Sequence, residues 1–214
     1  MTPGFFLVVE GPDGSGKSTL AAGLAERMRE AGLDPILVRQ PGGTPAAERI
    51  REAFLDSTVH FEPQTELLYI CAARAHLVQE VIRPALAAGR IVISDRYELS
   101  THAYQGAGRG LDRQTVALVN GVATGGLRPH LTLVLDIPPD VGLRRQQQAG
   151  KVGDRLERAD PAFHRSPTLP ACCWRRSPTS GGMSSTSVRC GRSPPVATPF
   201  TSATVCRSSP RPAP

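Results

Sequence analysis

The chain of 214 residues contains no run of 18 apolar residues, and its N-terminus lacks a charged start followed by a cleavable apolar segment. The first absence argues against a membrane span and the second against a secretion signal, so we expect a cytoplasmic protein with no membrane partner. The five cysteines also lack paired C-x-x-C spacing, and four of them lie after residue 171. Neither a zinc site nor a disulfide framework is therefore expected.

Acidic residues and lysine are absent from residues 166–214, whereas six arginines lie there. The whole chain has 25 basic and 19 acidic side chains, so removing those six arginines leaves 19 of each sign in residues 1–165. The formal net charge of +6 therefore belongs to the tail. A neutral body gives no electrostatic reason to expect a nucleic-acid partner.

Short apolar runs alternate with helix-like segments in the body of the chain. The runs at residues 5–9, 35–38, 90–94 and 131–135 predict buried strands. Apolar residues at every fourth position from 20 to 28 predict one helix, and residues 67–82 predict a longer one. This alternation predicts an α/β fold with a parallel sheet and helices on both faces. We expect one domain over residues 1–165.

Residues 166–214 are crowded with Ser, Pro, Thr and Gly and show neither the helical nor the strand period. We therefore expect this tail to be disordered, without a buried strand or an amphipathic helix.

The segment GPDGSGKST matches the phosphate-binding pattern G-x-x-x-x-G-K-[ST] between a predicted strand and a predicted helix. Its glycines allow successive backbone N–H groups to face one anion, and the helix N-terminus adds partial positive charge. Lys17 is expected to reach the β and γ phosphates of a nucleoside triphosphate, and Ser18 to bind Mg²⁺. The expected nucleotide-binding residues are Gly11, Pro12, Asp13, Gly14, Ser15, Gly16, Lys17, Ser18 and Thr19.

A second acidic signal follows the apolar run at residues 90–94. Asp95 stands at the carboxyl end of that predicted strand, the edge at which ligands of parallel sheets gather. Its carboxylate is expected to hold Mg²⁺ or a magnesium-bound water, and the adjacent Arg96 to bind an oxyanion. A solvated acid–base pair at a strand end is the alternative.

Several segments together resemble the bacterial thymidylate kinases: EGPDGSGKSTLA, RQPGGT, AARAHLV, VISDRYELSTHAYQG with GRGL, LTLVLDIPPDVGLRR and DRLE. They occur in the family's order and rough spacing, over residues 5 to about 165. The resemblance implies the fold of P-loop nucleoside monophosphate kinases and a homodimer. It also implies transfer of the γ-phosphoryl group of ATP to dTMP, which gives dTDP in dTTP synthesis.

The same resemblance implies roles at the acceptor phosphate. Arg39 and Arg96 would grip this phosphate, since the guanidinium fork suits a phosphate group. Asp13 would contact the deoxyribose or the acceptor end of the site, with a loop-capping aspartate as the alternative.

For the base, the resemblance implies that Arg74 reads a thymine carbonyl and that Thr101 and Gln105 are polar contacts. Tyr104 would pack where a ribose 2′-hydroxyl would fall and so favour deoxyribose. A surface arginine and a plain core tyrosine are the alternatives at these two positions. Many family members carry an aromatic residue that stacks on thymine where this chain has Ile70, so weaker base discrimination is expected.

Two further features bear on catalysis. The family's REPGG is RQPGG here, and Gln40 cannot supply the carboxylate that Glu would. The phosphate loop carries no basic residue besides Lys17, so a mobile lid at about residues 144–158 is expected to supply the cation. Arg155 is the first choice as its catalytic residue, and Arg144, Arg145 and Arg158 are the other candidates.

The resemblance ends at about residue 165, where the family continues with a long helix, a further strand and a terminal helix. We expect this last strand and helix to be missing and the sheet edge to be open. A shifted reading frame would explain the tail's composition, and a native interaction tail is the alternative. Two other functions stay open: a kinase for another nucleoside monophosphate, and a nucleotide-binding module with little turnover.

Overall fold

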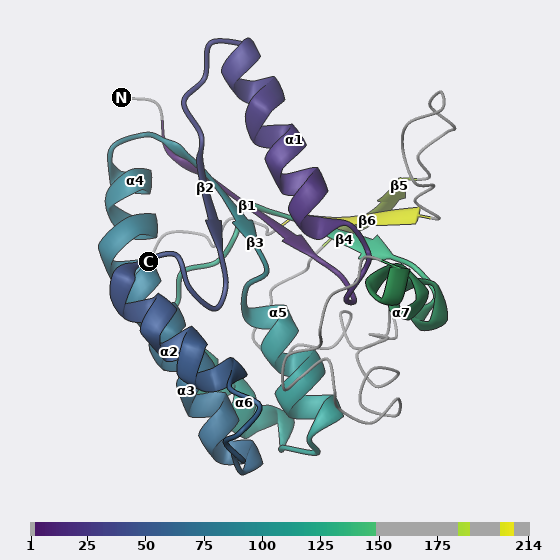
Figure 1. Ribbon diagram of the computed structural model, residues 1–214. Coiled ribbons are helices and arrows are strands. Elements are labelled where there is room, and N and C mark those ends of the chain that lie inside the picture. The colour runs from purple at the N-terminus through teal and green to yellow at the C-terminus, as the bar shows by residue number, and fades with distance from the viewer. Residues whose placement is uncertain (1–2, 149–183, 189–201, 208–214) are drawn as a thin grey trace.

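The computed structural model describes residues 3–148, 184–188 and 202–207. Its centre is a sheet in which four parallel strands lie in the order β2-β3-β1-β4 (Figure 1). Their bounds are Phe5–Glu10 for β1, Ile36–Arg39 for β2, Ile91–Asp95 for β3 and Leu131–Asp136 for β4. These bounds agree with the four predicted strands to within one residue at each end. The predicted parallel sheet is therefore confirmed.

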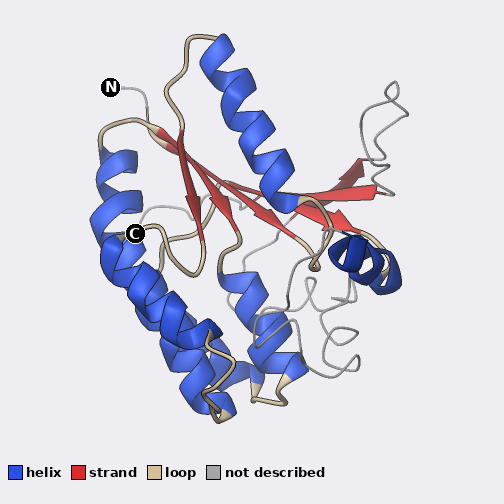
Figure 2. Ribbon diagram, in the orientation of Figure 1, coloured by secondary structure: helices blue, strands red, loops and turns tan. Residues whose placement is uncertain are grey.

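Helices cover both faces of this sheet, as predicted (Figure 2). Helix α1 (Lys17–Glu30) buries Ala21 and Ala25 against Leu7, Val9 and Ile93. On the opposite face, Phe6, Val8 and Val92 pack against Leu77 and Ile82. Alternate residues of β1 and β3 therefore point to opposite helical layers, which is why both strands read as continuous apolar runs.

The predicted long helix is three consecutive segments: α3 (Pro63–Leu77), the π-helical η1 (Val78–Ile82) and α4 (Arg83–Ala87). Of the apolar residues that marked it, Leu67 and Cys71 are buried, whereas Leu68 is 58% exposed. Helix α2 (Pro45–Leu55) precedes α3, with the side chain of Thr44 accepting a hydrogen bond from the backbone N–H of Ala47.

Three helical segments connect β3 to β4, and a fourth follows β4. They are α5 (Glu98–Thr101), the π-helical η2 (His102–Gly108), α6 (Arg113–Thr124) and α7 (Pro139–Gln148). Helix α6 packs on α3 through Val116 and Ala123, next to Leu67 and Cys71. The carboxyl ends of β1 and β3 point toward a region bordered by α1, α5 and α3 (Figure 1).

The tail contains two strands, contrary to the expectation that it supplies none. Strand β6 (Ser202–Arg207) pairs antiparallel with β4, and β5 (Ser184–Val188) pairs antiparallel with β6. The edge of β4 is therefore paired, which corrects the expectation of an open sheet edge. Backbone N–H and C=O groups of an edge strand can pair with any extended segment, whatever its hydrophobic period.

The other predictions about residues 149–214 lie outside the described residues. They comprise the domain boundary at residue 165, the disorder of the tail, the shifted reading frame and most of the lid at residues 144–158.

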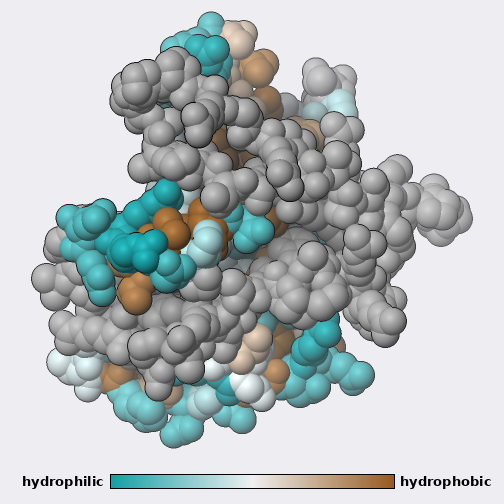
Figure 3. Space-filling model, turned by 90° about the vertical axis from the view of Figure 1, so that its right-hand side faces the viewer, coloured by the Kyte–Doolittle hydropathy of each residue, from teal (hydrophilic) through white to brown (hydrophobic). Residues whose placement is uncertain are grey.

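On the face drawn in Figure 3, hydrophilic side chains border small hydrophobic areas of the described surface. Within residues 3–148, no helix is both long enough and apolar enough to cross a membrane.

Candidate functional site

The phosphate loop connects β1 to α1 as predicted. Gly11, Gly14 and Gly16 have φ values of 147°, 73° and 90°, a region that favours glycine because side chains with a Cβ rarely adopt it. Gly16 is the N-cap of α1, and no side chain caps the first turn of this helix. The first N–H groups of α1 therefore lack a side-chain cap and can bind a phosphate.

Lys17 is buried in this loop with 6% of its surface exposed. Its Nζ donates a hydrogen bond to the carbonyl oxygen of Pro12 at 2.7 Å and lies 4.0 Å from a carboxylate oxygen of Asp13. Burial and the nearby Arg96 guanidinium lower the pKa of Lys17 to about 8. A polyphosphate at this position would favour the charged ammonium form and raise this pKa again.

Ser18 and Asp95 meet across the loop, although 77 positions separate them. The Ser18 hydroxyl donates to Asp95 Oδ2 at 2.5 Å. Asp95 Oδ1 is buried and has no hydrogen-bond partner among the described residues. A hydroxyl beside a carboxylate with one free oxygen is the oxygen-rich donor set that Mg²⁺ prefers, so these two residues fit the expected cation.

Arg96 is held in an unusual backbone conformation. Its φ of 72° is the only positive value at a non-glycine residue among the described residues. Buried Glu10 accepts hydrogen bonds from Tyr97 N at 2.8 Å, from Ser100 N at 3.2 Å and from Ser100 Oγ at 2.7 Å. The Ser94 hydroxyl donates to the carbonyl oxygen of Arg96 at 2.7 Å. Hydrogen bonds on both sides therefore fix the strained residue.

The Arg96 side chain reaches the phosphate loop. Its guanidinium pairs with Asp13 and lies 5.3 Å from the centre of the Tyr104 ring. The Tyr104 hydroxyl donates to the second carboxylate oxygen of Asp13 at 2.7 Å. Burial raises the pKa of Tyr104, which keeps this hydroxyl a donor. Asp13 therefore joins Lys17 and Arg96, and Tyr104 is part of the site rather than a plain core aromatic.

Arg74 is buried at the other end of the site, with 2% of its surface exposed, so it is not a surface arginine. Its Nε donates to the Gln40 side-chain oxygen at 2.8 Å, and its NH2 nitrogen donates to the carbonyl oxygen of Tyr97 at 2.9 Å. Its third nitrogen contacts the side-chain oxygen of Asn120. Gln40 therefore supplies a neutral acceptor where the family pattern has a carboxylate.

The residues expected at the base lie beside Arg74. Thr101 and Gln105 are fully buried, and each has a side-chain oxygen, Oγ1 and Oε1 respectively, with no partner among the described residues. Ile70 is 9% exposed and lies in the same wall. The neighbouring Tyr69 packs against Phe61 with ring centres 4.8 Å apart. The wall therefore offers two unpaired oxygens and an aliphatic surface.

Arg39 and Arg51 lie on the side of the site formed by β2 and α2. Arg39 pairs with Glu48 at 3.0 Å, and Glu48 also accepts the N–H of Gly43 at 2.8 Å. Arg51 donates to the carbonyl oxygen of Pro41 at 2.9 Å. Arg39 therefore lines the cavity, and Arg51 is an additional cation in its lining.

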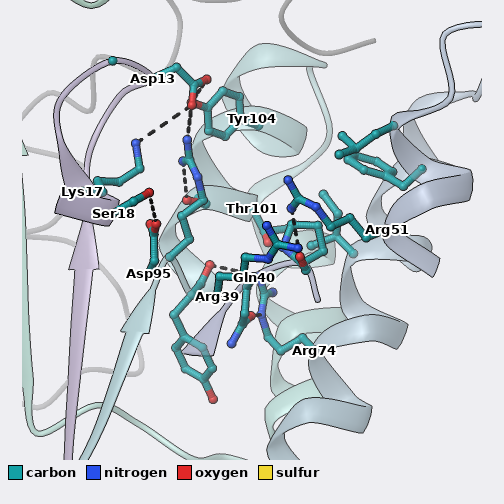
Figure 4. A pocket seen from close by; sticks show the side chains of 18 of the residues that line it. Asp13, Lys17, Ser18, Arg39, Gln40, Arg51, Arg74, Asp95, Thr101 and Tyr104 are labelled. Atoms are coloured by element: carbon teal, nitrogen blue, oxygen red, sulfur yellow. Dashed lines mark hydrogen bonds and ion pairs between the residues drawn. The ribbon is translucent and has the colours of Figure 1, made fainter. Parts of the chain in front are cut away.

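These side chains line one cavity of 460 Å³. Figure 4 shows Lys17, Ser18 and Asp95 at one end and Gln40 and Arg74 at the other. The predicted residues in its lining are Asp13, Gly14, Gly16, Lys17, Ser18, Thr19, Arg39, Ile70, Arg74, Asp95, Arg96, Thr101, Tyr104 and Gln105. Gly11, Pro12 and Ser15 belong to the loop without lining this cavity.

The lid arginines fall into two groups. Arg145 donates to the carbonyl oxygen of Gly14 at 3.4 Å and lines the cavity, whereas Arg144 pairs with Asp140 at 2.7 Å on an exposed part of α7. Arg155 and Arg158 lie outside the described residues, so the role of Arg155 stays a prediction.

Sequence reasoning missed several residues that shape the site. Glu10 reads as the end of an apolar strand and Arg51 as one of several charges on an amphipathic helix. Asn120 lies 46 positions from Arg74 and Glu66 lies 39 positions from Gln105, so only the tertiary structure brings each pair together. Buried polar residues in otherwise apolar helical faces were the available signal.

Comparison with known proteins agrees with this geometry. A family model described as thymidylate kinase matches residues 9–168. The thymidylate kinase of Deinococcus radiodurans is 49% identical over 165 residues, which cover 77% of this chain and 80% of that protein. The thymidylate kinase of Pseudomonas fluorescens (strain SBW25) is 52% identical over 161 residues, which cover 75% and 76% of the two chains.

A solved structure gives the same result at the level of the fold. The crystal structure of thymidylate kinase from Ehrlichia chaffeensis superposes with a TM-score of 0.60 at 32% identity, over 69% of this chain and 79% of that one. The family model matches well over half of the present chain, and the relatives' identity lies far above the level at which only the fold is shared. This chain therefore belongs to the thymidylate kinase family.

Proposed function

We propose that this protein transfers the γ-phosphoryl group of ATP to dTMP, producing ADP and dTDP. One observation carries the proposal: Asp13 connects Lys17 of the phosphate loop with Arg96 at the carboxyl end of β3, in one cavity. A donor phosphate on the loop and an acceptor phosphate on Arg96 would meet at this point. Two phosphates side by side are what a monophosphate kinase requires.

At the donor end, the backbone N–H groups of the phosphate loop and Lys17 bind the β and γ phosphates of ATP. An oxygen of the dTMP phosphate attacks the γ-phosphorus, the bond from that phosphorus to the bridging oxygen breaks, and ADP leaves with the released electron pair. The chain supplies position and positive charge rather than a nucleophile, so Lys17 and Arg96 carry the catalytic role.

At the acceptor end, Arg39 and Arg96 hold the dTMP phosphate. Tyr104 lies under Arg96 and beside Asp13. In this position it would leave room for a deoxyribose and exclude a 2′-hydroxyl. Arg74 and Thr101 contact the base, with Ile70 as the aliphatic surface below it. Arg74 is pre-oriented by three acceptors, which lowers the entropic cost of binding the base.

Ser18 and Asp95 are the residues that would hold Mg²⁺, directly or through water. When bound, Mg²⁺ neutralises charge on the transferring phosphates. No group of three or more His, Cys, Asp or Glu side chains suited to a metal exists in the described part of the chain. A cation held by two protein oxygens and by the phosphates needs no such group. Arg145, and Arg155 when the lid closes, would add positive charge at the γ-phosphate.

The exposed faces of α3 and α6 favour a homodimer. Leu68 on α3 is 58% exposed, and Leu118 and Val122 on α6 are 71% and 78% exposed. The two helices pack together through their buried sides, so these apolar side chains lie on one pair of neighbouring helices. A second copy of the chain that covers them would bury the largest exposed apolar side chains of this pair.

The function is tested by a coupled ADP-release assay with dTMP, dUMP, AMP and CMP as acceptors. We expect the highest kcat/KM with dTMP. A higher value with AMP or CMP would identify another monophosphate kinase. ATP binding without turnover on any of the four would reject the kinase function.

A further inference from the structure

The amide of Gln105 is held in one orientation by a carboxylate behind it. Gln105 lies on η2, is fully buried and lines the cavity. Its Nε2 donates to Glu66 Oε2 at 3.3 Å, whereas its Oε1 has no partner among the residues that the structure describes. The nitrogen therefore faces α3, whereas the oxygen points away from Glu66 and is a buried acceptor without a partner among the described residues.

Glu66 is itself fixed by Arg109. Its side chain is 1% exposed, and its two oxygens accept from Arg109 Nε at 3.1 Å and from the Arg109 NH2 nitrogen at 3.0 Å. A carboxylate paired in this forked way offers only acceptors. Rotation of the Gln105 amide by 180° would place two oxygens against each other. Glu66 and Arg109 therefore decide which end of the amide faces the cavity.

We infer that Glu66 is a positioning residue that makes the base site select for a ring N–H group. This inference rests on the proposed function and names how that site chooses its pyrimidine. With the Gln105 oxygen fixed toward the cavity, an imide such as thymine or uracil donates its ring N–H to it. Cytosine presents a ring nitrogen with a lone pair at the corresponding position, so both atoms would be acceptors and one buried acceptor would stay unsatisfied.

Dissociation constants for dTMP, dUMP and dCMP, measured by calorimetry with the full chain, test the inference independently of turnover. We expect the wild-type protein to bind dTMP at least about 100-fold more tightly than dCMP, since mismatched buried polar groups are strongly rejected. In Glu66→Gln, Gln105 is free to rotate, and this ratio should fall about 10-fold. The dTMP-to-dUMP ratio should stay unchanged, because both bases carry the imide N–H.

Glu62→Gln is the matched control, because Glu62 precedes the same helix with its side chain 74% exposed. It should leave both ratios as in the wild type. Gln105→Leu removes the oxygen and should give the same loss of dTMP-to-dCMP selectivity as Glu66→Gln. The double variant should lose no more than either single one, because both act through one atom.

The inference is wrong if the wild type does not prefer dTMP to dCMP, or if Glu66→Gln weakens all three nucleotides equally. Should Glu66→Gln fail to fold, Arg109→Met decides, since Arg109 is 26% exposed. Reduced dTMP-to-dCMP selectivity in that variant supports the inference, and unchanged selectivity overturns it. Absence of turnover with dTMP, with the binding ratios as expected, would instead reject the proposed kinase function and leave the inference standing.

Discussion

Among the side chains of the cavity, Lys17 has a pKa that the surrounding protein shifts, and this shift can be measured. Burial and Arg96 lower its pKa to about 8 in the free protein. The ammonium form binds polyphosphate, so ATP affinity should be constant below this pH and fall, by up to about tenfold per pH unit, above it. A titration of the ATP dissociation constant across alkaline pH measures this.

Lys17→Arg gives the control for this pH dependence. A guanidinium does not lose its proton in this range, so the bend near pH 8 should disappear even if affinity is lower throughout. A bend of equal size in the variant would show that another group causes it.

Lys17→Ala should abolish phosphoryl transfer, because it removes the positive charge beside the β and γ phosphates.

Arg96 is assigned to the acceptor phosphate, so its removal should affect the two substrates differently. For Arg96→Ala we expect kcat/KM for dTMP to fall about 100-fold, roughly 2.7 kcal/mol, with the KM for ATP changed less than about threefold. Arg96→Lys keeps the positive charge but lacks the guanidinium fork, so its kcat/KM for dTMP should lie between those of the wild type and Arg96→Ala. Steady-state kinetics with each substrate varied in turn measures this; equal losses for ATP and dTMP would assign Arg96 to the donor.

For single residues, the sequence predicted which residues lie in the site better than it predicted their hydrogen-bond partners. The motif spacing identified Lys17, Asp95 and Arg96, because a loop between a strand and a helix has few geometries. The motif did not reveal that Gln40 accepts a hydrogen bond from Arg74, because the replacement of Glu by Gln in the sequence shows only the loss of a charge. Glu10, Glu66 and Asn120 were missed because their partners lie 87, 39 and 46 positions away.

Among the elements, the junction between β3 and α5 depends most on a single buried group. Glu10 holds Tyr97 and Ser100 through three hydrogen bonds. Glu10→Ala should therefore lower the free energy of unfolding by about 3 kcal/mol, because it leaves one buried and one partly buried N–H group without an acceptor. Chemical denaturation measures this. Glu26→Ala, at an exposed position of α1, should change it by less than about 0.5 kcal/mol; equal effects would contradict the role of Glu10.

The four parallel strands were predictable because each reads as an apolar run. Strands β1 and β3 are buried on both faces, whereas Leu37 of the edge strand β2 is 40% exposed. The π-helical turns were not predictable, since one extra residue per turn leaves little trace in apolar spacing. Strands β5 and β6 were also missed, because backbone pairing along β4 does not require alternating apolar side chains.

At the scale of the whole molecule, the apolar surface of α3 and α6 leads to a prediction about assembly. Leu118→Glu places a charge in this surface and should convert the proposed dimer to a monomer, because an unpaired charge in an interface costs several kcal/mol. Leu33→Glu, at a residue 47% exposed just after α1, should leave the dimer intact. Sedimentation equilibrium measures both masses. A wild-type protein that is monomeric at all concentrations would refute the homodimer.

The central claim is that the cavity brings a donor and an acceptor phosphate together. Its most direct test follows the label from ATP that carries ³²P in the γ position, with dTMP present or absent and products separated by chromatography. The proposed function predicts that the label appears in dTDP, that it requires dTMP, and that Lys17→Ala abolishes it. Label that appears as inorganic phosphate at the same rate with and without dTMP would contradict the claim.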